Sequence, residues 1–482
     1  MTPHDLSRRH WLAWAAGLSS ASALSARADT DAPSESDPRF ATTLHKRVAS
    51  DTVGLAAVQV GPAGMRLHIL GLRRQGEPGP VTTQTVFEWG SLTKAFVALV
   101  LADGVLRGEW ALDDPVEAGL PEGLKLRDRD GAPLRLIDLA THRSGLPRMP
   151  TNIGRKELGD PYPHYNEVRL NSFLRTWRPG HARGERFEYS NLGYGLLSRV
   201  LAQHSGQSLD SLLASRVLGP LGMNGVRIRR PLSGTDDLAA IGASIQAMRA
   251  ASARDASGHG ADRQPVSPWS FDVLAGAVGL VGPVEPLGRF MQAALCLIDH
   301  PLREAFALCL QQRTEGEHPL RPFGLAWELG PMVGRQSQRM LFNQDGATAG
   351  FSSSLWIEPA RQRGAAVLAN TFVETRGLAL QGLDADIRSE DFARMQLPAE
   401  ALLPLVGRYV LDPRYALDIR SRAGRLFAQG TGQVEFELLP MAPRRFFTRH
   451  NKLEVEFEDN PQPARLMVLR EGQGLPFVRS AP

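Results

Sequence analysis

The chain has 482 residues, of which 43% are hydrophobic and 22% are charged, a balance typical of globular proteins with enough apolar material for a large core. This length exceeds that of one average domain. The formal net charge of +4 comes without long blocks of Lys or Arg, so no nucleic-acid partner is expected. No stretch approaches the ~18 consecutive apolar residues of a stable membrane span.

The N-terminus has the parts of an export signal. Residues 7–12, Ser-Arg-Arg-His-Trp-Leu, resemble a twin-arginine motif, and the Ala-rich, moderately apolar stretch 11–24 is too short for a transmembrane helix. Residues 26–28, Ala-Arg-Ala, offer a small-x-small cleavage site. We therefore predict that residues 1–28 form an export signal and that the protein is periplasmic, exported by the twin-arginine route. Sec export, and a cytosolic protein with an N-terminal amphipathic helix, are the alternatives.

The first motif that carries chemistry is the pair Ser91 and Lys94. Positions three apart share a face of a helix, so Lys94 would lie beside the Ser91 hydroxyl and help to remove its proton. The first helical turn would also place backbone N–H groups around Ser91. The apolar stretch 95–101 indicates that this helix is buried. The pattern indicates a serine acylation site, although on its own it also occurs by chance at solvated helix starts.

The second motif is Tyr189 with Asn191, followed by the apolar stretch 193–197. A phenol held near two cations can lose its proton well below its free pKa, so Tyr189 is a candidate general base. The Asn191 amide is suited to hydrogen-bond a substrate carbonyl. The structural alternative is a turn followed by a core helix.

The two cysteines, Cys296 and Cys309, lie in helical-looking segments. A periplasmic location would permit a bridge between them, and two buried, reduced thiols are the alternative. The 12 His show no helical pair of the metalloprotease type, so neither a metal nor a cofactor is expected.

From about residue 398 the chain predicts short strands separated by turns. Residues 434–438 and 453–457 alternate with period two, which is typical of a half-buried antiparallel sheet.

Together these features resemble the serine beta-lactamase and penicillin-binding-protein superfamily, and within it the class C-like branch. Besides the two motifs, similar segments follow in family order: 112–116, 139–147, 220–223, 275–280, 323–327 and 343–353. The resemblance implies an α+β, beta-lactamase/transpeptidase-like fold, in which an antiparallel sheet flanked by helices meets a helical subdomain at Ser91. The C-terminal strands resemble the small all-β barrel domain appended to some members.

The third family motif departs from its pattern. Gln344 stands where the edge strand carries Lys in many members, or His in this branch. Gly346 is retained, so a substrate can approach the strand, and the resemblance implies that the N–H groups of Ala347 and Ser91 form an oxyanion hole. The positive charge that attracts a substrate carboxylate in relatives is lost, so an arginine such as Arg148 or Arg321 would have to replace it.

The domains expected are an export signal (1–28), a beta-lactamase-like serine hydrolase domain (29–393) and a C-terminal beta-barrel domain (398–482). The function expected is that of an exported serine hydrolase acting by a covalent acyl-enzyme on amide or ester bonds, beta-lactamase / D-alanyl-D-alanine carboxypeptidase-like. Its substrate would be a beta-lactam, a D-Ala peptide or an ester, and peptidoglycan is a further candidate partner. The alternatives are an esterase or D-aminopeptidase on the same scaffold and a non-catalytic cell-wall-binding protein. The role of the barrel domain and the oligomeric state stay open.

Overall fold

The computed structural model describes residues 38–153, 160–231, 254–315, 322–331, 339–384, 397–413, 415–448, 453–470 and 473–480. The predicted export signal and Arg321 lie outside these residues. Within the described ranges, every helix is too short or too polar to cross a lipid bilayer.

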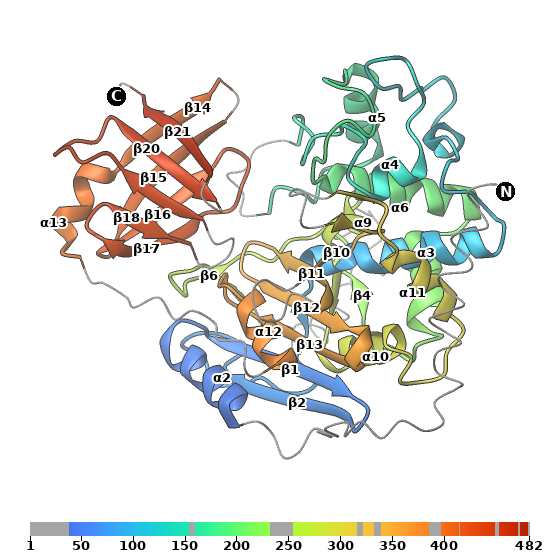
Figure 1. Cartoon of the computed structure of the whole chain (residues 1–482), viewed down its shortest axis with the longest axis horizontal. Coiled ribbons are helices and arrows are strands. Elements are labelled where there is room, and N and C mark those ends of the chain that lie inside the picture. The colour runs from blue at the N-terminus through green and yellow to red at the C-terminus, as the bar shows by residue number, and fades with distance from the viewer. Residues whose placement is uncertain are drawn as a thin grey trace, which may run out of the picture. The chain divides into compact units, whose positions relative to one another are not determined.

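The part before the C-terminal strands is built on an eight-stranded antiparallel sheet with the strand order β2-β1-β13-β12-β11-β10-β9-β8 (Figure 1). Its strands are β1 (Gly54–Gly61), β2 (Gly64–Gly71), β8 (Thr314–Glu315), β9 (Pro322–Phe323), β10 (Glu328–Pro331), β11 (Met340–Ala347), β12 (Ser352–Glu358) and β13 (Arg363–Ala369). The central strands β1, β12 and β13 are buried along almost their whole length, because helices cover both faces of the sheet.

Strand β1 shows how the two faces are filled. Leu55 and Ala57 pack with helices α2 (Pro38–Ser50) and α12 (Arg376–Leu383), whereas Ala56 and Val58 belong to the large core on the other face. This alternation follows from the period of two in an extended strand. Helix α10 (Glu285–Ala294) contributes Phe290 and other apolar side chains to that second core.

Helix α3 (Thr93–Leu106) runs through the centre of the helical part. Every residue from Thr93 to Gly104 is buried, which explains why its sequence is apolar on all sides rather than on one stripe. The other helices of this part are α4 (Leu136–Ala140), α5 (Glu167–Thr176), α6 (Asn191–Ser205), α7 (Leu209–Leu213), α9 (Ala275–Val278) and α11 (Arg303–Leu310), with the short helical turns η1 (Gly90–Leu92), η2 (Val116–Gly119) and η4 (Ala214–Leu218). The turn η6 (Pro359–Arg361) joins β12 to β13.

Two small sheets complete this part. One has the order β3-β7-β4, from β3 (Phe87–Glu88), β7 (Leu280–Gly282) and β4 (Arg227–Ile228), and the other pairs β5 (Gly258–His259) with β6 (Pro265–Val266). The first is important for the site because β3 leads directly into the turn that carries Ser91.

The C-terminal strands close into an eight-stranded antiparallel barrel, preceded by α13 (Ala399–Leu402) and η7 (Leu403–Leu405) (Figure 1). The strands are β14 (Gly407–Asp412), β15 (Tyr415–Arg422), β16 (Arg425–Gly430), β17 (Phe436–Ala442), β18 (Arg445–Phe447), β19 (Glu454–Phe457), β20 (Arg465–Arg470) and β21 (Gln473–Arg479). Tyr409, Phe446 and Phe457 lie in its core, and of these Phe457 belongs to the predicted period-two stretch 453–457. The architecture is thus the α+β fold with a small all-β barrel that the sequence predicted.

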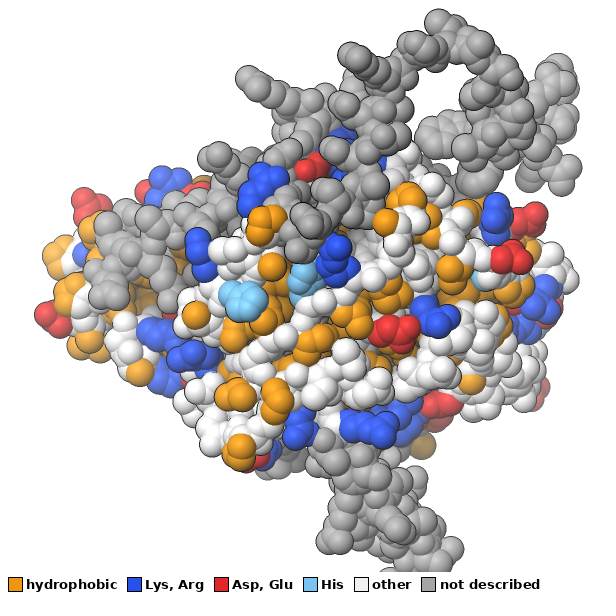
Figure 2. Space-filling view, turned by 90° about the horizontal axis from the view of Figure 1, so that it is seen from below, with side chains coloured by type: hydrophobic (Ala, Val, Ile, Leu, Met, Phe, Trp, Pro, Cys, Tyr) orange, Lys and Arg blue, Asp and Glu red, His pale blue; other side chains and the backbone are white. Residues whose placement is uncertain are grey.

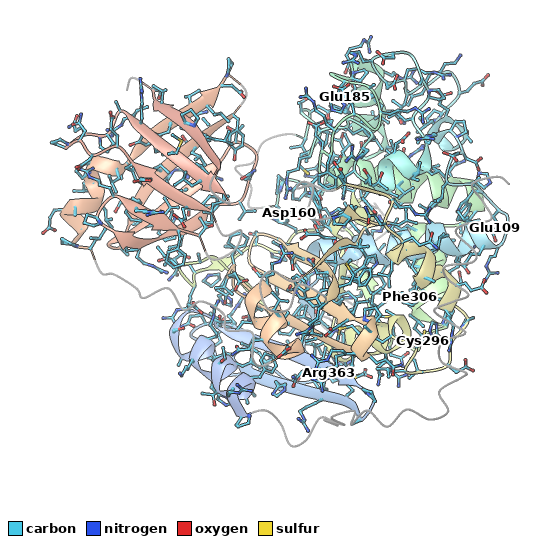
Figure 3. All side chains as sticks on the ribbon, viewed as in Figure 1. Glu109, Asp160, Glu185, Cys296, Phe306 and Arg363 are labelled. Carbon is cyan, nitrogen blue, oxygen red and sulfur yellow. The ribbon has the colours of Figure 1, made fainter. Side chains whose placement is uncertain are left out.

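Both cysteines are free thiols, so the prediction of a disulfide bridge, one of the two alternatives, is wrong. Cys309 on α11 is buried, and burial raises the pKa of its thiol. Cys296, labelled in Figure 3, is exposed, contrary to the expectation of two buried thiols.

On the face seen in Figure 2, basic and acidic side chains are interspersed.

Candidate active site

Ser91 lies in a tight turn between β3 and α3. Gly90 has a φ of 54°, and a Cβ at this position would lie 2.7 Å from the Ala347 nitrogen, so glycine is required both by conformation and by space. Thr93 Oγ1 donates to the Gly90 carbonyl at 2.7 Å and fixes the turn from within. The Ser91 side chain is held in a set position and remains 9% exposed.

Lys94 is fully buried, and its Nζ has three oxygen neighbours. These are Ser91 Oγ at 2.9 Å, Asn191 Oδ1 at 2.8 Å and the Ala277 carbonyl at 3.0 Å. Burial, with a smaller contribution from the charge of Arg148, lowers the pKa of Lys94 well below its ordinary value. Lys94 therefore loses its proton more readily than a solvated lysine does.

All three contacts of Lys94 Nζ are hydrogen bonds in which it donates, to Ser91 Oγ, Asn191 Oδ1 and the Ala277 carbonyl. The amide and backbone carbonyl oxygens of Asn191 and Ala277 can only accept. If the amine lost one proton, these two oxygens would occupy its two remaining N–H groups, and its lone pair would face Ser91 Oγ.

The ring of Tyr189 lies over Lys94 Nζ. Its ring centroid is 4.7 Å from Lys94 Nζ and 5.1 Å from the Arg148 guanidinium carbon, and the ring of His142 lies 4.3 Å away. The Tyr189 hydroxyl hydrogen-bonds with the side chains of Ser91 and Gln344.

The expectation that Tyr189 loses its proton well below its free pKa is wrong. Burial raises the pKa of the phenol, and this effect exceeds the lowering by the Ser91 hydrogen bond, the charge of Arg148 and the Gln344 hydrogen bond. Tyr189 is a protonated phenol in the resting site.

The segment before α6 is held by the loop that contains Ser144 and Pro147. Ser190 caps α6 by accepting from the Gly193 N–H at 2.8 Å, and its hydroxyl donates to the Pro147 carbonyl at 2.7 Å. The Ser190 N–H donates to His142 Nδ1 at 3.0 Å. Asn191 uses its carbonyl oxygen for Lys94, so for a substrate it offers its N–H₂ group, which now points to Met149 Sδ at 3.4 Å.

Strand β11 closes the site from the other side. Gln344 is 5% exposed, and its Nε2 donates to the Ser91 carbonyl at 3.0 Å. A Cβ at Gly346 would lie 2.3 Å from the Trp89 carbonyl and 3.0 Å from the Ser91 nitrogen. Only glycine allows the strand to run this close to the Ser91 turn, so the backbones of Ser91 and Ala347 lie close together.

The structure thus brings the predicted site residues together: Ser91, Lys94, Tyr189, Asn191, Gln344, Gly346 and Ala347. Of the two arginines that the sequence offered as a replacement cation, Arg148 lies beside Tyr189. Sequence reasoning did not assign the Ala277 carbonyl or His142 to the site. The only signal for them was their position inside the family-like segments 275–280 and 139–147.

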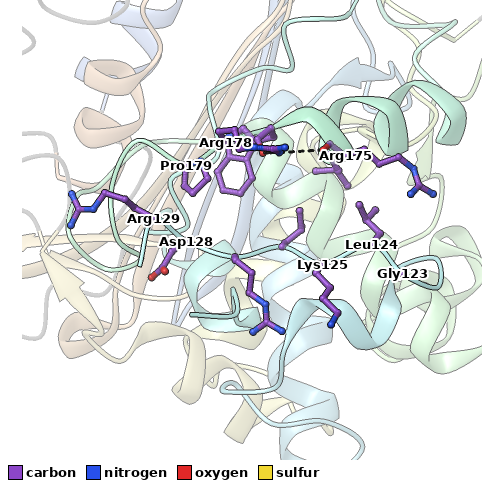
Figure 4. Close-up of a pocket in the computed structure, with 12 residues that line it drawn as sticks. Gly123, Leu124, Lys125, Asp128, Arg129, Arg175, Arg178 and Pro179 are labelled. Atoms are coloured by element: carbon purple, nitrogen blue, oxygen red, sulfur yellow. Dashed lines mark hydrogen bonds between the residues drawn. The ribbon is translucent and has the colours of Figure 1, made fainter. Parts of the chain in front are cut away.

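No group of three or more His, Cys, Asp or Glu side chains that could hold a metal ion occurs in the described ranges. A separate pocket of about 640 Å³ lies between residues 123–129 and the end of α5 (Figure 4). Its lining includes Lys125, Arg175 and Arg178 but none of the predicted site residues.

Comparison with known proteins places this geometry in context. Residues 40–387 match the family model described as Beta-lactamase. A beta-lactamase of Escherichia coli (strain K12) is 25% identical over 323 residues, which cover 60% of this chain and 77% of that protein. The D-alanyl-D-alanine-carboxypeptidase/endopeptidase AmpH of the same organism is 30% identical over 193 residues, which cover 39% of this chain and 50% of that protein.

Two solved structures share the fold. The D-alanine carboxypeptidase AmpC from Burkholderia cenocepacia has a TM-score of 0.58 at 23% identity and covers 72% of this chain and 99% of its own. The octameric penicillin-binding protein homologue from Pyrococcus abyssi has a TM-score of 0.59 at 19% identity and covers 92% of this chain and 100% of its own.

Proposed function

Because this chain belongs to the beta-lactamase family, we propose that it is a serine hydrolase that cleaves amide or ester bonds through a covalent acyl-enzyme on Ser91. The observation that carries the proposal is the set of three contacts of Lys94 Nζ. In the deprotonated amine, two carbonyl oxygens occupy the N–H groups and leave the lone pair to the Ser91 hydroxyl. A buried, neutral lysine costs stability, and a protein that only bound its ligand would have no physical need for it.

In the acylation step, the Lys94 lone pair takes the Ser91 proton while Oγ attacks the substrate carbonyl carbon. The carbonyl π bond opens, and its oxygen becomes an oxyanion that the N–H groups of Ser91 and Ala347 stabilise. The N–H₂ group of Asn191 holds a carbonyl on the substrate. Each oxyanion-hole donor is typically worth about 10²–10³ in kcat.

Departure of the leaving group requires a proton. The protonated phenol of Tyr189, hydrogen-bonded to Ser91, supplies that proton as the bond breaks, and the ammonium group of Lys94 then returns a proton to the phenolate. Both groups are back in their resting states. In deacylation, a water molecule gives its proton to this pair and attacks the acyl carbon, and Ser91 Oγ leaves with the proton that the pair returns.

For the substrate we propose a beta-lactam, a D-Ala peptide or an ester. The names of the relatives favour the first two, since they are a beta-lactamase and a D-alanyl-D-alanine-carboxypeptidase/endopeptidase. Gln344 favours an esterase or D-aminopeptidase as the second candidate, because a neutral donor binds a carboxylate more weakly than a cation does, by about 1 kcal/mol or more.

Intact-mass analysis of the purified protein tests the proposal. The protein is incubated with a penicillin and, separately, with a small p-nitrophenyl ester, and Ser91→Ala is the control. A penicilloyl adduct on Ser91 assigns the protein to the beta-lactam-recognising enzymes, and ester turnover without this adduct assigns it to the esterases or peptidases. Absence of adduct and turnover, or equal activity of Ser91→Ala, contradicts the acyl-enzyme and favours a wall-binding protein.

We also propose that residues 1–28 direct export to the periplasm by the twin-arginine route, and that residues 29–393 and 398–482 are the hydrolase and barrel domains. The support is the arginine pair, the short apolar stretch and the Ala-Arg-Ala site in the sequence. N-terminal sequencing of the periplasmic protein should begin at Asp29. Replacement of both arginines by lysine should abolish export, and unchanged export would assign the signal to the Sec route.

A further inference from the structure

Arg148 is positioned by the catalytic segment itself. Its carbonyl accepts the N–H groups of Asn191, at 3.0 Å, and Leu192, at 3.3 Å, so its backbone is fixed to the start of α6. Its side chain is exposed, and the guanidinium carbon lies 5.1 Å from the centroid of the Tyr189 ring.

The charge of Arg148 acts on the groups of the proposed site. Burial is the larger cause of their shifts: it lowers the pKa values of Lys94 and His142 and raises that of Tyr189, and the charge of Arg148 acts to lower all three. With the Tyr189 ring centroid 5.1 Å away, the guanidinium lies beside these groups.

The guanidinium of Arg148 has no hydrogen bond or ion pair within the part of the chain that the structure describes. Comparable arginines are paired: Arg229 contacts Glu88 and Asp255, each at 2.6 Å. Arg376 lies 2.8 Å from Glu328.

The carboxylates whose charges reach Tyr162 and Tyr189 are already engaged. Asp160, labelled in Figure 3, accepts from the N–H and the hydroxyl of Ser270 at 2.8 and 2.7 Å. Asp345 accepts from the Ser354 hydroxyl and lies 3.5 Å from Arg376.

The other polar neighbours of Tyr189 hold a positive charge less readily than Arg148 does. Burial lowers the pKa values of Lys94 and His142 well below their ordinary ranges, and Gln344 is a neutral amide. Of the described cationic side chains near the Tyr189 ring, Arg148 is the exposed one.

We propose that Arg148 binds a carboxylate of the substrate, and that the substrate class is an anionic ester, amide or beta-lactam. The inference rests on the proposed acyl-enzyme function. Arg148, an exposed loop residue, would supply the positive charge that Gln344 does not provide. A guanidinium stays charged at all relevant pH values and offers a planar pair of N–H donors that matches a carboxylate. The Tyr189 ring packs against the guanidinium of Arg148 and holds its orientation without neutralising its charge.

The test uses two matched substrate pairs, which place the carboxylate on either side of the scissile bond. On the leaving group, 4-acetoxybenzoate is compared with 4-acetoxybenzamide. On the acyl group, the mono-4-nitrophenyl ester of adipic acid is compared with the 4-nitrophenyl ester of adipamic acid. The quantity measured is the ratio of kcat/KM for the anionic and the neutral member. Because both members use the same catalytic groups, effects of a substitution on Lys94 or Tyr189 cancel in the ratio.

Wild type should prefer the anionic member of at least one pair by about 10-fold or more, as expected for a charged hydrogen bond. Arg148→Gln should bring this ratio to about one, and Arg148→Lys should keep part of it. Arg186→Gln is the matched control, since Arg186 is also exposed and lies near Glu185 at 3.7 Å, and it should keep the wild-type ratio. A wild-type ratio near one in both pairs, or an unchanged ratio in Arg148→Gln, would overturn the proposal.

A binding measurement separates this proposal from the catalytic one. Calorimetry on Ser91→Ala compares the Kd values of the same anionic and neutral compounds, with and without Arg148→Gln. If wild type turns over none of the four esters, the acyl-enzyme function is contradicted, while the Kd ratio still decides whether Arg148 recognises the carboxylate.

Discussion

The closest approach in the proposed site lies between β11 and the Ser91 turn, and Gly346→Ala tests whether this approach forms the oxyanion hole. The added Cβ would lie 2.3 Å from both the Trp89 carbonyl and Ser353 Oγ, and 3.0 Å from the Ser91 nitrogen. A carbonyl of the main chain cannot rotate away as a flexible side chain can. The strand or the turn must therefore move.

The size of the effect follows from these distances. To reach ordinary van der Waals contact, the strand and the Trp89 carbonyl must separate by about 1 Å, and a misplacement of this size typically costs about 100-fold in rate. Since the N–H groups of Ala347 and Ser91 lie on the two moving segments, loss of one donor would add to this. We expect kcat/KM of Gly346→Ala to fall by about 10²–10³. The overpacking should also lower the free energy of unfolding by about 1–3 kcal/mol.

The assay is p-nitrophenyl ester hydrolysis, together with a thermal melt that confirms folding. Gly61→Ala is the control, because Gly61 ends strand β1 of the same sheet and a Cβ there would meet only the Gln362 carbonyl, at 3.9 Å. That variant should keep wild-type kinetics. A folded Gly346→Ala protein with kcat/KM within a few-fold of wild type would refute the assignment of the oxyanion hole to this junction.

Two further predictions concern protons. Tyr189→Phe should lower the rate of amide or beta-lactam hydrolysis by about 10²–10⁴-fold. The rate of p-nitrophenyl ester hydrolysis should fall much less, because a nitrophenolate departs without a proton. Equal losses of rate on both substrates in steady-state assays would argue against Tyr189 as the acid. Lys94→Met should abolish acylation. It should also change the pH dependence of stability: burial lowers the Lys94 pKa from 10.5, so below pH 10.5 the unfolded state binds more protons and wild-type stability rises with pH towards that value. Denaturant unfolding between pH 6 and 9 should show this rise in wild type relative to Lys94→Met, and identical slopes would mean that Lys94 is charged.

The sequence predicted what depends on local geometry. The spacing of Ser91 and Lys94 places both on one helical face, and their contact is 2.9 Å. The period-two alternation at 453–457 marks a strand whose Val455 and Phe457 are buried. Closure of the barrel was recognised only by resemblance, because β14 pairs with β21 through contacts such as Tyr409 with Arg479, which no local pattern encodes.

Protonation states escaped prediction for the same physical reason. The pKa of Tyr189 depends on burial beneath His142 and Arg148, which belong to one loop, and on a hydrogen bond to Gln344 on β11. From the sequence, nearby cations were expected to lower this pKa. In the fold, burial of the phenol is the larger effect and reverses the direction of the shift.

The lowered pKa of Lys94 also gives a physical reason for the neutral residue on β11. A second ammonium at position 344 would lie beside Tyr189 and Ser91, next to an amine whose pKa burial and Arg148 already depress. The exposed guanidinium of Arg148 acts on Lys94 and Tyr189 at a smaller desolvation cost, because water solvates its outer side. On this basis Gln344→Lys should depress the pKa of Lys94 further, shift the acid limb of the kcat–pH profile to lower pH and leave the preference of Arg148 for anionic esters in place. A shift of the acid limb to higher pH would show that Lys94 is not the group that must be neutral.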